Sequence, residues 1–288
     1  MNEPMIAAAR KRYHQRLVDA GVLSIYNGIA SNADSHYPLS IKIAAPIAAK
    51  LGAKETKKLQ PQSIGTQFEK HTMIFLAETF PNLQHLRPGN WNILQLGNQN
   101  NVKTADFAQY EHLAYLAELM EANKNLATVL GNDYMVSPDI VIYRELCEDE
   151  EINLREPIVN DDTCKLAALR KSNHGKPILH ASVSAKWTIR SDRAQNSRTE
   201  ALNLIRNRKG HLPHIVVVTG EPLPSRIASL ALGTGDIDCV YHFALYELIQ
   251  SVYNNSQEGR EDALETIMNL ISGKRLKDIS DLPLDLSV

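Results

Sequence analysis

The chain has 288 residues, of which 43% are hydrophobic and 22% are charged, and its formal net charge is −2. These fractions match an ordinary globular protein, and neither glycine nor proline is periodic, so a disordered or collagen-like chain is excluded. No stretch approaches the ~18 unbroken apolar residues that a membrane span needs. The N-terminus has no apolar run of signal-peptide length, so we expect no export signal. Three scattered cysteines cannot form a disulfide scaffold, and we expect a reduced, cytoplasmic protein.

The near-neutral net charge hides an asymmetry along the sequence. Residues 165–211 contain eleven Lys or Arg and two acids, whereas residues 144–162 contain eight acids and two bases. A local basic block in a near-neutral protein suggests one face for a polyanion such as nucleic acid. On charge alone, a solvated surface is the more frequent explanation of such a block.

The N-terminal half of the chain shows helical spacing of its apolar residues. We expect helices over residues 5–22, 41–53, 66–80 and 105–130, the last with Tyr110, Leu113, Ala114 and Ala117 on one face. Residues 28–40 are polar and rich in turn formers, which predicts a loop or an extended arm.

The second half alternates strand-like and helical segments. Short β-branched runs predict buried strands over residues 138–144, 178–190 and 214–220, and the acidic segment 145–162 predicts a loop. Helices are expected over residues 192–208, 242–254 and 259–273, with further short elements at 226–233 and 236–241. This order predicts an α/β fold with helices on the faces of a sheet. We expect one domain over residues 1–288, with an N-terminal arm and helices to about 130 and the core after about 131.

Three side chains of the central segment could serve phosphodiester hydrolysis. Asp139 begins one predicted strand, and Lys186 lies near the end of the next, on the same sheet face as Ser184 because strand side chains alternate. Glu200 lies fourteen residues after Lys186 on the helix that follows, and Glu69 lies on an earlier predicted helix. Carboxylates hold Mg²⁺, the metal stabilises developing charge and acidifies a bound water, and a lysine can orient that water. An aspartate that forms a turn at a buried strand edge explains a lone match more often.

A second pattern joins the second predicted strand to the helix after it. The sequence there is Arg190-Ser191-Asp192-Arg193. Arginine pairs bidentately with guanine O6 and N7, and aspartate accepts from cytosine N4, so this segment could recognise a CC/GG half-site. The structural alternative is that Ser191 or Asp192 only caps the helix.

The block that contains this segment carries a family resemblance. It is ILHASVSAKWTIRSDRAQNSRTEALNLIRNRKGHLPHIVVVTGEPLPSRIASLALGTGDIDCVYHFALYELI, with weaker similarity in SNAD, HLRPGNWN, PDIVIYR and GKRLKDISDLPLDLSV. It resembles the NgoMIV-type, CCGG-core family of type II restriction endonucleases in the PD-(D/E)XK superfamily. The resemblance implies a restriction-endonuclease-like α/β core with a central mixed sheet flanked by helices. It also implies Mg²⁺-dependent cleavage of double-stranded DNA at GCCGGC, after the first G, with 5′-phosphate overhangs, by a homotetramer built from dimers.

The resemblance also implies roles for individual residues. The metal would be held by Asp139, Glu69, Glu200 and the backbone carbonyl of Ala185, with Lys186 as the catalytic lysine. Ser184 stands where related nucleases carry an acid, and Glu200 supplies that acid from the following helix. The inner CCGG would be recognised by Arg190, Ser191, Asp192 and Arg193, the outer G·C pair by Arg226 and Asp34, and the minor groove by Gln62.

The sequence departs from the family pattern at two positions and leaves two alternative functions open. Ala185 replaces a cysteine but keeps the carbonyl, whereas His36 replaces a small polar residue and puts the neighbouring outer-base contact in doubt. The chain could instead be a DNA-binding relative without catalysis, or a nuclease that reads only the CCGG core. Trp187 follows the lysine on the opposite face, which favours core packing over base stacking.

Overall fold

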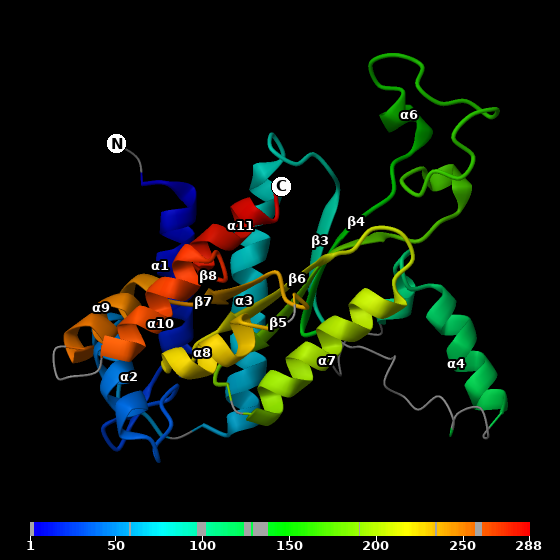
Figure 1. The fold of residues 1–288 in the computed structure, drawn as a ribbon. Helices are drawn as coiled ribbons and strands as arrows, with labels where there is room; N and C mark the ends of the chain where they lie inside the picture. Colours follow the sequence, from blue (N-terminus) through cyan, green and yellow to red (C-terminus); the bar gives the residue numbers. More distant parts are fainter. Residues whose placement is uncertain are drawn as a thin grey trace.

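The chain folds around a mixed six-stranded sheet (Figure 1). The structure is a computed structural model that describes residues 3–57, 59–96, 102–123, 128, 138–189, 191–233, 235–256 and 261–288. The strands are β3 (Trp91–Gln95), β4 (Ile140–Arg144), β5 (Ile178–Lys186), β6 (His214–Thr219), β7 (Cys239–His242) and β8 (Leu276–Asp278). They lie side by side in chain order, with β3, β4 and β5 antiparallel and β5 to β8 parallel. The expected mixed α/β sheet is therefore confirmed.

The middle of the sheet is buried, which explains its sequence. Residues 215–218 of β6 are Ile-Val-Val-Val, and each is at most 5% exposed. A parallel strand covered on both faces favours such an unbroken apolar run. Strands β3 and β8 were not predicted from the sequence. The residues of β3 are only half-buried at the sheet edge, and β8 has three residues, so neither carries a strong pattern.

Helices flank the sheet. They are α1 (Met5–Asp19), α2 (Pro38–Lys50), α3 (Pro61–Thr79), α4 (His112–Ala122), α6 (Asp149–Ile152), α7 (Ser191–Asn207), α8 (Pro224–Ala231), α9 (Leu245–Ser256), α10 (Glu261–Ser272) and α11 (Leu282–Asp285). Helix α3 packs across β3 and β5 and against α1, while α7 runs beside α8, which contacts β7 (Figure 1). No helix in the described ranges is long and apolar enough to span a membrane.

The expected arm at residues 28–40 is only partly irregular. A small hairpin of β1 (Ile25–Tyr26) and β2 (Ile29–Ala30) includes the first residues of this range, and α2 already begins at Pro38. The hairpin turns at Asn27 and Gly28, with φ of 50° and 74°. Two central residues with positive φ are the geometry that an Asn-Gly turn favours. The segment between Ser31 and Tyr37 is left to form the arm.

The helix expected over residues 105–130 is wrong at its start. Helix α4 begins at His112, and a short 3-10 turn, Thr104–Asp106, precedes it; residues 124–127 and 129–137 lie outside the described residues. The side chain of Gln109 exchanges hydrogen bonds with the backbone of Leu179, and the Tyr110 hydroxyl donates to the Leu204 carbonyl. These bonds to β5 and α7 hold the segment in place and override its helical propensity.

The acidic segment forms an excursion between β4 and β5 that projects from the body of the molecule (Figure 1). It is mostly loop, as expected, with the four-residue helix α6 within it. The guanidinium of Arg170, 4% exposed, binds both carboxylate oxygens of Asp149 at 2.7 and 2.6 Å. This bidentate pair closes the excursion at its base.

A buried ion cluster joins the N-terminal helix to the far edge of the sheet. The guanidinium of Arg10, on α1, binds Glu247 of α9 at 2.6 Å and Asp278 of β8 at 2.9 Å. Asp278 is fully buried and also accepts a hydrogen bond from the backbone N–H of Leu245. The cluster therefore links α1, α9 and β8 through one guanidinium.

Replacing Asp278 with alanine should lower the free energy of unfolding by about 3–5 kcal/mol, because Arg10 would keep a buried charge with only one partner. Urea denaturation measures the change. Lys11→Ala is the matched control, since its ion pair with Glu3 is exposed and should contribute less than about 1 kcal/mol. Equal losses for the two variants would contradict this account of the cluster.

Candidate active site

The carboxylate of Asp139 holds the beginning of β4 against the end of β5. Its Oδ2 accepts from Lys186 Nζ at 2.7 Å, from the Ala185 backbone N–H at 2.8 Å and from Ser184 Oγ at 3.4 Å. The carbonyl of Asp139 accepts from the N–H of Leu96 at 2.9 Å, which continues the β3–β4 ladder. Asp139 and Lys186 are thus in direct contact, and Ser184 shares the face of Lys186 as its spacing predicted.

Lys186 is the last residue of β5, and its side chain is 19% exposed. Burial lowers the pKa of Lys186. The charge and hydrogen bond of Asp139, together with the charges of Glu200 and Glu69, raise the pKa by more than burial lowers it. The net pKa shift is upward, so the amine stays protonated. The Lys186 carbonyl accepts from Thr219 Oγ1 at 2.8 Å, which fixes the strand end to β6.

Two glutamates from different helices approach this ion pair. Glu69 lies in α3 and Glu200 in α7, and burial together with the nearby charge of Asp139 raises the pKa of each to about 7. Gln95, at the end of β3, donates to the Glu69 carboxylate at 3.0 Å, and the charge of Lys186 opposes both shifts. Three carboxylates therefore surround one lysine, and this arrangement favours an additional cation.

The donor atoms of the site fit Mg²⁺ in kind, because they are all carboxylate or carbonyl oxygens. The Ala185 N–H faces Asp139, and the N–H and C=O of one strand residue point to the same side, so its carbonyl lies on that side too. Within the described ranges, no group of three or more His, Cys, Asp or Glu is placed to hold a metal. Few protein ligands, completed by water and phosphate oxygens, are the usual Mg²⁺ arrangement.

The structure adds a contact that the sequence did not suggest. Ser184 Oγ lies 3.3 Å from Ser197 Oγ, a 3% exposed side chain of α7 one turn before Glu200. The two hydroxyls therefore connect α7 to β5 at this point. A serine at this position of an amphipathic helix carries no sequence signal of its own.

Asp34 and Arg226, expected on the arm and after the third strand, meet directly. Arg226, in the first turn of α8, donates from Nη2 to Asp34 Oδ2 at 2.5 Å. The other oxygen, Asp34 Oδ1, accepts the backbone N–H of His36 at 3.0 Å. His36 thus supports Asp34 through its main chain, so the changed side chain at this position does not alter that contact.

The remaining predicted DNA contacts are only partly placed. Gln62 is exposed in the first turn of α3. Arg190 lies outside the described residues, and Ser191, Asp192 and Arg193 form the start of α7 without described side chains. Since α7 already includes Ser191 and Asp192, these two residues lie within its first turn. The first turns of α3 and α7 lie at the same edge of the molecule (Figure 1).

Trp187 packs in the core, as predicted. Its ring centroid lies 5.0 Å from that of Phe68 and 5.1 Å from that of Phe243.

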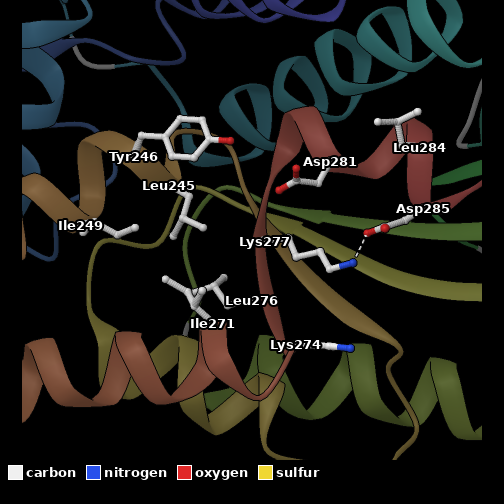
Figure 2. A pocket seen from close by; sticks show the side chains of 10 residues that line it. All are labelled: Leu245, Tyr246, Ile249, Ile271, Lys274, Leu276, Lys277, Asp281, Leu284 and Asp285. Atoms are coloured by element: carbon white, nitrogen blue, oxygen red, sulfur yellow. Dashed lines mark hydrogen bonds and ion pairs between the residues drawn. The ribbon is translucent and has the colours of Figure 1, made fainter.

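A pocket elsewhere, between α9, α10, β8 and α11, contains none of the predicted site residues (Figure 2). One wall carries the Lys277–Asp285 ion pair at 2.6 Å. We therefore place the candidate site at the strand ends and not in this pocket.

Comparisons with known proteins identify the class. The chain is 50% identical over 287 residues, 99% of each chain, to the type II restriction enzyme NgoMIV of Neisseria gonorrhoeae. A structure of the type IIF restriction endonuclease Bse634I with cognate DNA matches 80% of this chain and 73% of its own length, at 16% identity and a TM-score of 0.32. The 50% identity over the full length places this chain in the class of type II restriction endonucleases, which are site-specific deoxyribonucleases. Residues 13–288 match the NgoMIV restriction enzyme family model, and the chain belongs to that family.

The raised pKa of Glu200 predicts a pH-dependent stability. Because the folded-state pKa, about 7, lies above the ordinary 4.5, the folded protein holds this proton more tightly than the unfolded chain. The resulting stability is present below the ordinary pKa and is lost as the pH rises through about 7. Without divalent metal, Glu200→Gln should melt above the parent protein near pH ~8, because it removes the cost of burying a charged carboxylate beside Asp139. The expected gain is about 2–4 °C per kcal/mol of that cost.

At about pH 4.5 both proteins should melt at similar temperatures, since the group is then protonated when folded. Glu118→Gln, which changes an exposed glutamate of α4, should give no such pH-dependent difference. A gain for Glu200→Gln that is the same at both pH values would contradict a raised pKa of Glu200 in the folded protein.

Proposed function

We propose that this enzyme cleaves double-stranded DNA at GCCGGC after the first G, with Mg²⁺ as cofactor, and leaves 5′-phosphate overhangs. The observation that carries the chemistry is the contact of Asp139 with Lys186 at 2.7 Å, with Glu69 and Glu200 close enough for their charges to raise the pKa of Lys186. Membership of the NgoMIV restriction enzyme family supports the choice of DNA as substrate.

The chain's own residues divide the work of hydrolysis. Asp139 and the Ala185 carbonyl would hold the metal, with Glu69 and Glu200 on either side. A metal bound there would stabilise the negative charge that develops on the attacked phosphate and would make the attacking water easier to deprotonate. The Lys186 ammonium orients the attacked phosphate and the water. The water oxygen bonds to phosphorus as the water gives up one proton to solvent, the bond to the 3′ oxygen breaks, and that oxygen takes up one proton from solvent, so that one water is consumed overall.

Sequence recognition would use two groups of side chains. Arg190, Asp192 and Arg193, with Ser191 beside them, would contact the inner CCGG, because arginine matches guanine and aspartate accepts from cytosine. Arg226 and Asp34 would contact the outer G·C pair with the same chemistry. Their mutual ion pair supports this assignment, since a G·C pair offers the acceptors and the donor that each side chain provides to the other.

Binding of a duplex also requires the neighbouring surface. Gln62, exposed at the start of α3, would approach the minor groove. We further propose that the enzyme acts in the cytoplasm as a homotetramer built from dimers, as the family resemblance implies. A tetramer of this kind would carry two complete DNA sites.

A catalytically silent relative is the principal alternative. The intact Asp139–Lys186 contact argues against it, because a protein that only binds DNA gains nothing from placing the half-buried Lys186 among three acids. A nuclease that reads only CCGG is the second alternative. Digestion of plasmid DNA with Mg²⁺ separates the first from the proposal, and mapping of the cut ends separates the second.

Asp139→Ala and Lys186→Ala should each abolish cleavage while leaving specific DNA binding largely intact. Neither residue is proposed to contact a base, and each is needed for metal placement or water activation. Glu200→Ala should be severely impaired for the same reason. Digestion assays and gel-shift binding on one GCCGGC duplex measure the two effects, and normal cutting by the Asp139 or Lys186 variant would overturn the site.

The outer pair gives a second prediction. In ACCGGT the proposed arginine would face adenine N6 instead of guanine O6. Two mismatched pairs per site, at ~1–3 kcal/mol each, should reduce cleavage by about tenfold or more relative to GCCGGC. Matched duplexes with each of the four outer pairs measure this discrimination. Equal cutting of all four would remove the outer-pair roles of Arg226 and Asp34 and leave the nuclease proposal in place.

A further inference from the structure

Glu221 is a buried acid that the proposed chemistry does not use. It is 0% exposed and lies in the β6–α8 turn (residues 220–223). Its Oε2 accepts the backbone N–H of Ile189 at 2.8 Å, and its Oε1 accepts that of Leu223 at 3.1 Å. Oε2 also lies 3.8 Å from Nη1 of Arg226. One carboxylate therefore contacts both the residue directly before Arg190 and the guanidinium of Arg226.

Three further hydrogen bonds fasten the same turn. The side chain of Asn32, 1% exposed, donates to the Gly220 carbonyl at 2.8 Å, and Asn32 lies two residues before Asp34. The hydroxyl of Thr219 donates to the Lys186 carbonyl and accepts the N–H of Glu221 at 3.1 Å. The arm, the end of β5 and the start of α8 therefore all attach to one turn.

The turn has little freedom to move. A Cβ atom on Gly220 would lie 2.4 Å from Cε3 of Trp187 and 2.9 Å from its carbonyl oxygen. Trp187 itself is held between Phe68 and Phe243. A well-packed ring that leaves room only for glycine fixes the backbone position from which the Glu221 side chain extends.

We propose that Glu221 is a positioning residue that sets the start of α7, at residues 191–193, and Arg226 at a fixed separation, so that inner and outer base pairs are recognised together. The inference rests on the proposed function, which assigns bases to both groups. Glu221 does not contact DNA in this account. It acts through the backbone of Ile189, the turn before α8 and the Arg226 guanidinium.

A carboxylate is the side chain that this position requires. Two buried N–H groups approach it, and each needs an acceptor. The pKa of Glu221 is raised to about 7, mainly by burial and also by the charge of Asp34. The two N–H bonds and the charge of Arg226 oppose this upward shift. Glutamine has the same shape but one acceptor oxygen, so its NH₂ group would face one of the two N–H donors. Glu221→Gln therefore disturbs one end of the connection with little change in volume.

The test measures affinities of Glu221→Gln and the parent protein for three duplexes, with Ca²⁺ in place of Mg²⁺. The duplexes contain GCCGGC, ACCGGT or no CCGG. We expect the ratio of affinities for GCCGGC and ACCGGT to fall about tenfold or more, towards one. Affinity for the duplex without CCGG should change by less than about threefold, since phosphate contacts dominate it.

A variant of another buried glutamate separates positioning from stability. Glu247, 9% exposed, pairs with Arg10 in the ion cluster and has no described contact with the reading groups. Glu247→Gln should lower the melting temperature without changing the affinity ratio. The ratio is measured on one preparation, so it does not depend on the fraction of protein that is folded.

The outcomes distinguish this inference from the proposed function. If the parent protein itself binds GCCGGC and ACCGGT equally, the outer-pair assignment fails and the positioning role falls with it. If the parent discriminates and Glu221→Gln discriminates equally well, only the role of Glu221 is overturned. Should Glu221→Gln fail to fold, Thr219→Val, which removes the hydroxyl bonded to the Glu221 N–H, must lower the ratio, and Thr219→Ser must preserve it.

Discussion

Oδ2 of Asp139 is the atom on which the arrangement of the site depends. It accepts hydrogen bonds from Lys186, Ala185 and Ser184, and so joins the start of β4 to the end of β5. Removing this charge would leave Lys186 as a half-buried cation among two glutamates of raised pKa. The same contacts concentrate negative charge at the strand ends, which disfavours the metal-free protein and favours a bound divalent cation. The negative charge that would bind the metal therefore lowers the stability of the metal-free protein.

Recognition and hydrolysis share elements of the fold. Helix α7 begins with the proposed base-reading residues, contacts Ser184 through Ser197, and carries Glu200 one turn later. A shift of this helix would move both a base contact and a carboxylate of the site. The β6–α8 turn adds a second connection, from the Lys186 carbonyl through Thr219 to Glu221. The geometry thus gives a physical route by which a wrong base pair could disturb the attacking groups.

The sequence predicted the parts of this structure that depend on local pattern. The apolar runs of β5 and β6 identify strands because both are buried, and alternation along β5 places Ser184 and Lys186 on one face. The helix start at residue 105 was wrong because Gln109 and Tyr110 bond to distant backbone. Glu69 and Glu200 were candidate acids in the sequence, but only the family resemblance assigned them to the metal, since no spacing predicts that α3 and α7 converge. Glu221 was missed because a lone acid after a strand carries no pattern.

The site as described requires that a divalent metal binds to Asp139, beside Lys186, when cognate DNA is present. A crystal structure with an uncleaved GCCGGC duplex and Ca²⁺ tests it most directly. We expect Ca²⁺ at about 2.3–2.6 Å from an Asp139 oxygen, with Arg226 and Asp34 on the outer G·C pair. A cation bound away from Asp139, or an Arg226–Asp34 pair that stays closed and distant from the bases, would contradict it.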